Sequence, residues 1–236
     1  MIGKEEFGRF EKQMVLKEIG ILGQTKLKAA KVAVVGAGGL GCPVLQYLNS
    51  MGVGTLGLID FDTVQESNLH RQILYTSEDI GKSKIECAAK RLKAQNPYTS
   101  IIEHNVVLSE ENAEEILSQY DIVIDGCDNF LTRYVVNDAC VKLGKPLVYG
   151  SILGFEGQMA TFNYKGSKNL RDIFPEPPNA EDVPNCSENG VLGSFPGIIG
   201  TMMAQEAVKL VLDMDVLANK LLLFETSTWK ITILNY

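Results

Sequence analysis

Short apolar runs and stretches of helical length alternate along the first half of the chain. Residues 31–35 (KVAVV) form a β-branched run that meets a glycine cluster, and the following segment has the pattern of a helix that ends at Gly52. The next apolar run, 55–59, continues until it meets acidic residues, as a buried parallel strand does. The order predicts a strand, a glycine turn, a helix and a second parallel strand.

The same rhythm continues to about residue 150. Further helices are predicted at 82–95, 109–120 and 131–144, and further strands at 100–108, 121–125 and 146–151. Beyond them the pattern predicts an alternating strand (156–164), a long loop rich in Pro, Asn and Gly (165–196), a helix (197–213) and paired strands (221–236).

The first thirty residues predict a helical lead-in. Its apolar stripe comprises Phe7, Phe10, Met14, Leu16 and Ile19, with Gly20 and Gly23 as stops.

This series of elements predicts an α/β fold with a doubly wound, mostly parallel sheet, a Rossmann-like half and a C-terminal extension of mixed strands. With 236 residues and 45% hydrophobic content, the chain can bury a full core. We expect a single domain over 1–236, made of a lead-in (1–30), a nucleotide-binding core (31–150) and a final portion of sheet, loop and helix (151–236).

Composition excludes several classes of protein. The chain has 22 basic and 29 acidic residues, a formal charge of −7 and no basic tract, so nucleic acid is not an expected partner. Its five cysteines are odd in number and never spaced C-x-x-C, which favours reduced thiols over a disulfide framework or a local zinc site. No signal core or long apolar run is present, so we expect a soluble, cytoplasmic protein without membrane association.

The glycine cluster has the form G-x-G-x-x-G, with Gly36, Gly38 and Gly41 between a strand and a helix. Asp60 stands nineteen residues after Gly41, at the end of the next strand. Glycines let the backbone approach a ligand closely, and a carboxylate at that strand end can accept hydrogen bonds from ribose hydroxyls. The motif alone leaves NAD, FAD and ATP open as ligands.

The stretch DFDTVQESNLHRQ, residues 60–72, favours a triphosphate. It adds Asp62 and then a cluster of amide and basic side chains, Asn68, Arg71 and Gln72, and Lys84 follows near the start of the next helix. Arginine can bind two phosphate oxygens at once and lysine acts as a point charge. A hydride-transfer enzyme has no obvious need for such a cluster. A further cation, Lys12, lies in the lead-in.

A carboxylate beside phosphates either repels them or holds a cation between them. Asp128, which follows the predicted strand in DIVIDGCDN, is therefore a candidate ligand of Mg²⁺. Its alternative role is to cap the helix that starts near Phe130, although Asn129 could take that role instead.

The motifs RFEKQ, GAGGLG, DFD, SNLHRQ, GKSK, DGCDN and NGVLGSFPGIIGTMMAQEAVK occur in this order along nearly the whole chain. Together they resemble the ThiF/MoeB/HesA family of adenylyltransferases, bacterial relatives of the ubiquitin-activating enzymes. The resemblance implies a homodimer that uses ATP and Mg²⁺ to adenylate the C-terminal glycine of a small ubiquitin-like sulfur carrier ending in Gly-Gly, with residues 151–236 facing the carrier. By position, the ATP contacts would be Gly39, Asp60, Asn68, Arg71, Lys84, Asp128 and Asn129, with Asp128 at the magnesium.

The chain departs from the family pattern in three places. Lys12 stands where the lead-in usually has a second Arg that is thought to reach the partner's ATP, so charge is kept but bidentate geometry is lost. The first of two C-x-x-C pairs found in many relatives would fall at 169–173, and neither pair is present, so we predict no zinc. Cys186 stands where relatives of the thiamine branch have a cysteine that can form a covalent link to the carrier, which makes it a candidate catalytic thiol.

The leading hypothesis is an enzyme that adenylates a sulfur carrier for thiamine-thiazole synthesis, with a sulfur-donor protein as a further partner. The same reaction on the molybdopterin-synthase carrier stays open, because the sequence does not distinguish the two. A different class would be an NAD-dependent oxidoreductase or a non-catalytic ATP-binding module.

Overall fold

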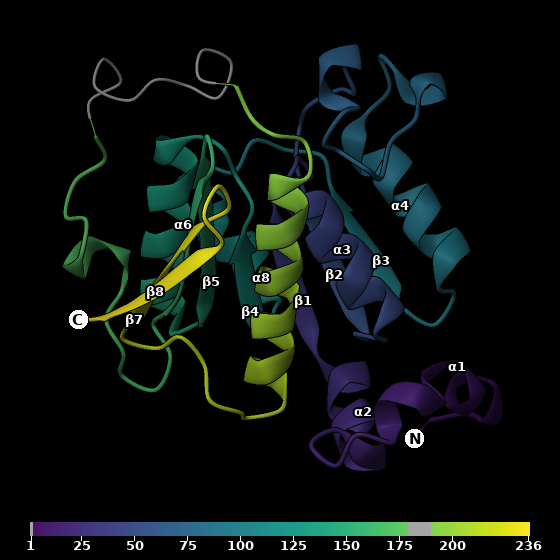
Figure 1. The fold of residues 1–236 in the computed structure, drawn as a ribbon. Coiled ribbons are helices and arrows are strands. Elements are labelled where there is room, and N and C mark those ends of the chain that lie inside the picture. The colour runs from purple at the N-terminus through teal and green to yellow at the C-terminus, as the bar shows by residue number, and fades with distance from the viewer. Residues whose placement is uncertain (1, 179–189) are drawn as a thin grey trace.

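The computed structural model describes residues 2–178 and 190–236. One eight-stranded sheet has the order β3-β2-β1-β4-β5-β6-β7-β8. Its strands are β1 Lys31–Val35, β2 Thr55–Ile59, β3 Ser100–His104, β4 Ile122–Asp125, β5 Leu147–Leu153, β6 Glu156–Phe162, β7 Lys220–Glu225 and β8 Lys230–Asn235. The α-helices are α1 Lys4–Met14, α2 Gly20–Ala29, α3 Gly41–Ser50, α4 Lys84–Gln95, α5 Ala113–Ser118, α6 Phe130–Leu143 and α8 Phe195–Val211 (Figure 1). Short 3₁₀ turns are η1 Glu66–Asn68, η2 Ser77–Asp79 and η3 Leu170–Asp172.

The sheet confirms the predicted fold class. Strands β3, β2, β1, β4 and β5 are parallel, and β6, β7 and β8 continue the sheet as antiparallel neighbours. The expected division at residue 150 falls inside β5, which pairs with β4 on one side and β6 on the other. One sheet therefore joins residues 31–150 to the C-terminal strands.

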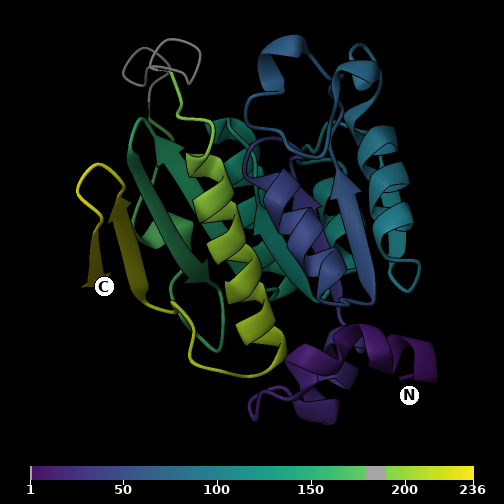
Figure 2. The ribbon, with the colours of Figure 1, turned by 45° about the vertical axis from the view of Figure 1, so that its right-hand side comes forward.

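Helices cover both faces of the sheet at the central parallel strands, so β1 is buried on both sides. In β1, Val32 and Val34 belong to the apolar cluster with α3, α4 and α8, whereas Ala33 and Val35 belong to the cluster with α5 and α6. Figure 2 shows α3 and α8 side by side on one face. This double layer holds the strand ends in fixed positions.

The lead-in forms two helices, α1 and α2, rather than a single helical stripe that ends at Gly20 and Gly23. Phe10 and Met14 are buried as predicted, but Phe7 and Leu16 are exposed. Gly20 adopts a positive φ of 55° and is the first residue of α2, so it turns the chain between helices instead of ending one. The prediction for Gly23 was also wrong, since it lies within α2.

Both lead-in helices lie at the amino ends of the parallel strands (Figures 1 and 2). The Gln13 side chain donates to the carbonyl of Met51, just after α3, and the Phe10 ring packs where a side chain on Gly52 would be. These contacts fix α1 beneath the far end of α3.

Two predicted elements are shorter than expected. The acidic helix predicted at 109–120 covers only Ala113–Ser118, because the Asn112 side chain accepts from the Ser109 amide and closes a turn before it. The strand predicted at 100–108 ends at His104, which lies opposite Ile59, the last residue of β2. Among the described residues β2 is its only neighbour in the sheet, so both strands end together.

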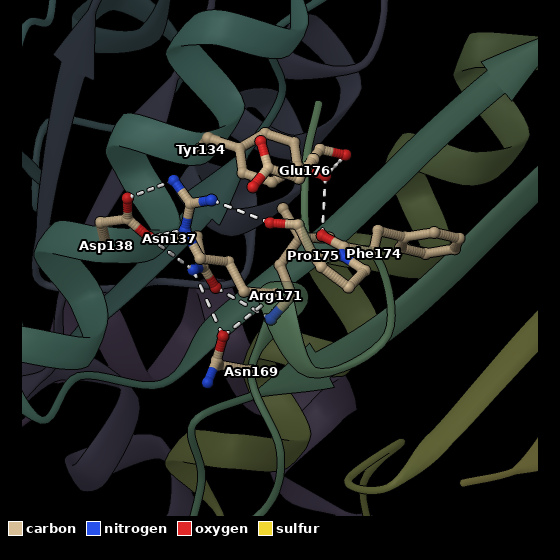
Figure 3. A network of polar contacts seen from close by, with 9 residues as sticks. Tyr134, Asn137, Asp138, Asn169, Arg171, Phe174, Pro175 and Glu176 are labelled. Carbon is tan, nitrogen blue, oxygen red and sulfur yellow. Dashed lines mark hydrogen bonds and ion pairs between the residues drawn. The ribbon is translucent and has the colours of Figure 1, made fainter. Parts of the chain in front are cut away.

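Part of the predicted long loop is held against α6 by polar contacts (Figure 3). Arg171 in η3 donates from Nε and Nη2 to the two carboxylate oxygens of Asp138, at 2.8 Å each, and lies over the Tyr134 ring. The Tyr134 hydroxyl meets the carbonyls of Phe174 and Glu176 at 2.8 Å. These contacts anchor the start of the segment to α6.

In the part of the chain that the structure describes, no helix combines the length and apolar character needed to cross a bilayer.

The packing of Gly41 gives a stability prediction. A Cβ on Gly41 would lie 1.8 Å from the carbonyl oxygen of Gly36, so Gly41→Ala must displace backbone and is expected to lower the free energy of unfolding by about 1–3 kcal/mol. In Gly8→Ala, the matched control, the new methyl on α1 meets nothing within 4 Å, and stability should rise by about 0.5–1 kcal/mol. Urea denaturation measures both, and equal changes in the two variants would contradict the steric account.

Candidate functional site

The candidate site lies where the strand order reverses direction. From β1 the chain moves outward through β2 and β3 and then returns to place β4 on the other side of β1. Val35, the last residue of β1, is in register with Ile59 and with Asp125, so three adjacent strands end together. The loops that leave these ends diverge and form the crevice in which parallel α/β sheets bind ligands.

The glycine loop between β1 and α3 has steric reasons for each glycine. Gly36 has φ of 91°, and a Cβ there would lie 2.7 Å from the carbonyl oxygen of Gly126. Around Gly38 and Gly39 the nearest groups are side chains of Gln72, Arg71 and Pro196. Gly36 and Gly41 therefore shape the loop, and Gly38 and Gly39 leave its backbone accessible to the polar residues beside it.

Asp60 braces this loop from the end of β2. Its Oδ2 accepts from the Ala37 amide at 2.7 Å, and Oδ1 accepts from the Asp62 amide at 2.9 Å. Tyr75 donates its hydroxyl to the Ala37 carbonyl at 2.8 Å, so the loop is fixed through both polar groups of one residue. A carboxylate oxygen can accept more than one hydrogen bond. Asp60 therefore keeps the capacity to accept from a ribose hydroxyl.

Lys84 is a buried cation beside this brace. It is the first residue of α4, is 5% exposed, and its Nζ lies 2.8 Å from Oδ2 of Asp62. Its amide also donates to the Asp62 carbonyl at 2.9 Å. Burial and this pairing hold the ammonium group in one place beside Asp62, whose amide is bound by Asp60.

Arg71 and Gln72 approach the glycine loop from the other side. The Nη1 of Arg71 donates to the Ser67 carbonyl at 2.9 Å and to Nε2 of His70 at 2.7 Å. Gln72 is 4% exposed, and its Oε1 is buried without a hydrogen-bond partner among the described residues. A buried acceptor of this kind is costly to leave unpaired, which suits a side chain that meets a ligand.

Asn68 and Asn129 have local partners. The Asn68 side chain accepts from the Gln65 amide at 3.3 Å, and Asn129 caps α6 by accepting from the Thr132 amide at 2.8 Å. The cap of α6 is thus Asn129 and not Asp128. Asp128 is exposed, and no hydrogen bond or ion pair joins its side chain to the rest of residues 2–178 and 190–236.

Lys12 is not brought to this crevice within one chain. It is exposed on α1, at the opposite end of the parallel strands. Cys186 lies outside the described residues.

The donor set fits Mg²⁺. No group of three or more His, Cys, Asp and Glu that could hold a metal occurs in the described ranges. Mg²⁺ needs no such cage, because it is usually held by one or two carboxylates together with substrate phosphates and water. Asp128, whose carboxylate is unpaired among the described residues, follows two residues after Gly126, which touches Gly36 of the glycine loop, so it would be the residue to hold Mg²⁺ beside a bound polyphosphate.

Sequence reasoning missed three residues that build the site. Asp125 ends the strand predicted at 121–125 and Tyr75 follows the stretch 60–72, but neither has a motif of its own, and Arg133 has the pattern of an ordinary helical residue. Their contacts are with residues that are distant in sequence, or they form only when the chain is buried in the fold, so no local pattern shows them. A charged residue in a strand that is otherwise wholly apolar, as Asp125 is in β4, was the available signal.

The fold and these loops define a doubly wound α/β protein with a nucleotide-type crevice. A family model described as the ThiF family matches residues 10–235, so the chain belongs to the ThiF family. It is 50% identical to a sulfur carrier protein adenylyltransferase of Thermus thermophilus, over 98% of this chain and 88% of that protein.

Two other comparisons extend this relationship. The chain is 48% identical to the adenylyltransferase and sulfurtransferase MOCS3 of Culex quinquefasciatus, over 95% of this chain but 51% of that relative, so it spans about half the relative's length. The fold is that of E. coli MccB, solved with MccA-N7isoASN, with a TM-score of 0.84 at 21% identity over 97% of this chain and 71% of MccB.

Burial predicts which cysteine thiols resist alkylation in the native protein. Burial raises the pKa of Cys42 and Cys140 to about 12, and burial with the nearby Asp125 carboxylate raises that of Cys127 well above its usual value. All three should stay protonated and unmodified by iodoacetamide at about pH 8 in the native protein, since only the thiolate reacts. Peptide mapping by mass spectrometry tests this, with the denatured protein as control. Native modification of these thiols before the half-buried Cys87 would contradict it.

Proposed function

We propose that this protein adenylates the C-terminal glycine of a small sulfur-carrier protein with ATP. The observation that supports the proposal is that three charged side chains lie close to adjacent strand ends. Arg71 lies beside Gly39 of the glycine loop, buried Lys84 pairs with Asp62 after β2, and unpaired Asp128 lies two residues after Gly126, which touches Gly36. The 50% identity to a sulfur carrier protein adenylyltransferase, over almost the whole of both chains, supports the substrate class.

The charges of the crevice fit a phosphate ligand that arrives with a divalent cation. The two cations of the crevice, Arg71 and Lys84, face carboxylates at Asp60, Asp62 and Asp128, and Lys84 is already paired with Asp62. Such a site is not cationic enough by itself to receive a triphosphate. Asp128 would hold Mg²⁺ at this site, and the ion would supply positive charge that offsets the phosphates.

The reaction needs no general base. A C-terminal carboxyl has a pKa of about 3.5, so the carrier arrives as a carboxylate. One of its oxygens attacks the α-phosphorus, the bond from that phosphorus to the bridging oxygen of the β-phosphate breaks, and pyrophosphate leaves with the electron pair. The products are the carrier's acyl-adenylate and pyrophosphate.

The residues of the crevice act by position and charge. Asp60 and Tyr75 hold the glycine loop where its backbone can approach the phosphates, and Asp60 would also accept from the ribose. Arg71 and Lys84 would bind phosphate oxygens and stabilise the departing pyrophosphate, while Asp128 holds the cation. These are the roles expected when anion repulsion, and not proton transfer, limits the rate.

The carrier that we propose is the one for thiamine-thiazole synthesis, supported by the family position of Cys186 in the sequence. The molybdopterin-synthase carrier is the alternative, because the relatives' names do not specify a carrier. We further propose a cytoplasmic homodimer in which Lys12 of one subunit serves the site of the other.

Exchange of labelled pyrophosphate into ATP tests the reaction. We expect Mg²⁺-dependent exchange that requires a Gly-Gly-ended carrier, and the carrier that supports it identifies the pathway. Asp128→Ala should reduce exchange by at least about a hundredfold with folding intact. Asp215→Ala is the matched control and should keep full exchange, because it removes an 89% exposed carboxylate whose one ion pair among the described residues is with Lys220. The proposal would be wrong if NAD stabilised the protein against unfolding and ATP–Mg²⁺ did not, or if no exchange occurred with either carrier.

Mixing of inactive variants tests the cross-subunit role of Lys12. Lys12→Ala and Asp128→Ala should each be slow alone, because each homodimer lacks one group at both sites. After subunit exchange, half of the dimers are mixed and each has one complete site, so activity should return to about a quarter of wild type. Activity of the mixture equal to the mean of the two separate variants would exclude a contribution from the partner subunit.

A further inference from the structure

A buried group of charged and polar side chains lies directly beneath the turn between β4 and α6. Asp125 has no exposed surface, Arg133 is 5% exposed and Tyr149 is 3% exposed. Nε of Arg133 lies 3.0 Å from Oδ2 of Asp125 as a charge contact without hydrogen-bond alignment. The remaining donors of Arg133 are thus free to bind other groups.

Those donors hold the backbone on both sides of the turn. Nη2 of Arg133 donates to the carbonyl of Cys127 at 2.9 Å and to that of Gly150 at 3.1 Å, and Nη1 donates to the Tyr149 hydroxyl at 3.2 Å. Arg133 therefore ties the turn after β4 to strand β5.

Asp125 holds the same residue from the other side. Its Oδ1 accepts from the amide of Cys127 at 3.1 Å and from its thiol at 2.5 Å. Both polar groups of the Cys127 backbone are thus bound by the two members of a buried ion pair. The next residue in the chain is Asp128.

The position of Asp128 depends on this arrangement. Its own side chain has no polar contact within the described residues, so only the backbone on either side sets its place. Asn129 on one side is fixed as the cap of α6, and Cys127 on the other is fixed by Asp125 and Arg133.

Stability alone gives a weak reason for such a pair. Moving two charges out of water costs about as much free energy as their attraction returns, and well-packed apolar residues often serve stability better. A planar arginine with several fixed donors is, however, well suited to fix the geometry of a turn.

We propose that Arg133 and Asp125 are positioning residues that hold Asp128 where its carboxylate meets phosphate-bound Mg²⁺. The inference rests on the proposed function, since it requires a polyphosphate in the crevice. Groups that orient a metal-binding carboxylate typically contribute about 10–100-fold to metal affinity.

Arg133→Lys tests the inference. It keeps the positive charge beside Asp125, but one ammonium group cannot reproduce the fork that reaches Cys127, Gly150 and Tyr149. We expect ATP to bind without Mg²⁺ within about threefold of wild type, and the Mg²⁺ concentration for half-maximal exchange to rise at least about tenfold. Calorimetric titration of ATP with and without Mg²⁺ supplies a readout independent of turnover, and the gain in affinity from Mg²⁺ should be lost.

Arg171→Lys is the matched control. Arg171 is also paired with an aspartate, in this case Asp138 of α6. That pair is exposed, and Arg171 anchors residues after η3 (Figure 3). The substitution should leave the Mg²⁺ midpoint unchanged. A folded Arg133→Lys protein with the wild-type midpoint and the wild-type gain in ATP affinity would overturn the inference.

Asp125→Asn covers the case in which Arg133→Lys does not fold. Its side-chain oxygen can still accept from Cys127 while Arg133 loses its charge partner, and the Mg²⁺ midpoint should again rise; an unchanged midpoint counts against the inference. If wild-type protein shows no exchange but Mg²⁺ strengthens ATP binding in an Arg133-dependent manner, the proposed reaction fails and the positioning role stands.

Discussion

The candidate site depends on a steric constraint, the approach of Gly36 to the turn after β4 more closely than a side chain would permit. This approach brings the loop after β1 against the loop after β4, and the hydrogen bond from the Gly126 amide to the Val35 carbonyl continues the strand pairing to that point. The glycine loop and the backbone that leads to Asp128 are thereby parts of one edge. Asp60 and Tyr75 add fixed contacts to this edge from β2 and the segment after it.

Charge in this edge is arranged in two layers. The buried layer, Asp125 with Arg133, is held by its own contacts and is almost fully shielded from solvent. The outer layer keeps groups with spare capacity, among them Asp128 and the buried oxygen of Gln72. Because the inner layer is rigid, the outer groups can stay in place without local partners. Preorganised sites use such fixed groups, which need not reorganise when charge develops in a reaction.

The fold was predictable because strand and helix signals are local. The apolar runs at 31–35 and 55–59, the glycine spacing and the change to alternating strands after residue 150 each predict one element from a few neighbours. The two helices of the lead-in were harder, because the turn at Gly20 is set by its positive φ and the burial of Phe10 depends on its contact with Gly52, just after α3.

The site was predictable only where a motif carried it. The residues of the glycine loop, Asp60 and Lys84 lie around the crevice as expected, but the bond of Asp60 to Ala37 and the pairing of Lys84 with Asp62 depend on how the loops fold back. Arg133 was missed because its partners lie in two separate segments, the turn after β4 and the middle of β5. The sequence also does not tell which end of a sheet a leading helix will cover, which is why Lys12 appeared to belong with Arg71 and Lys84.

The pairing of β1 with β4 has a consequence for synthesis of the protein. These neighbours are far apart in the chain, as the bond from the Lys31 amide to the Asp121 carboxylate spans 90 residues. At a translation rate of about 5–20 residues per second, β1 waits roughly 5–20 seconds on the ribosome with one edge unpaired. The ligand crevice cannot exist during that interval, because one of its walls is not yet made. A nascent chain therefore gains no stabilisation from its ligand until the middle of the sheet is complete, and the waiting edge of β1 is the point at which a partly made chain is most exposed to wrong strand pairing.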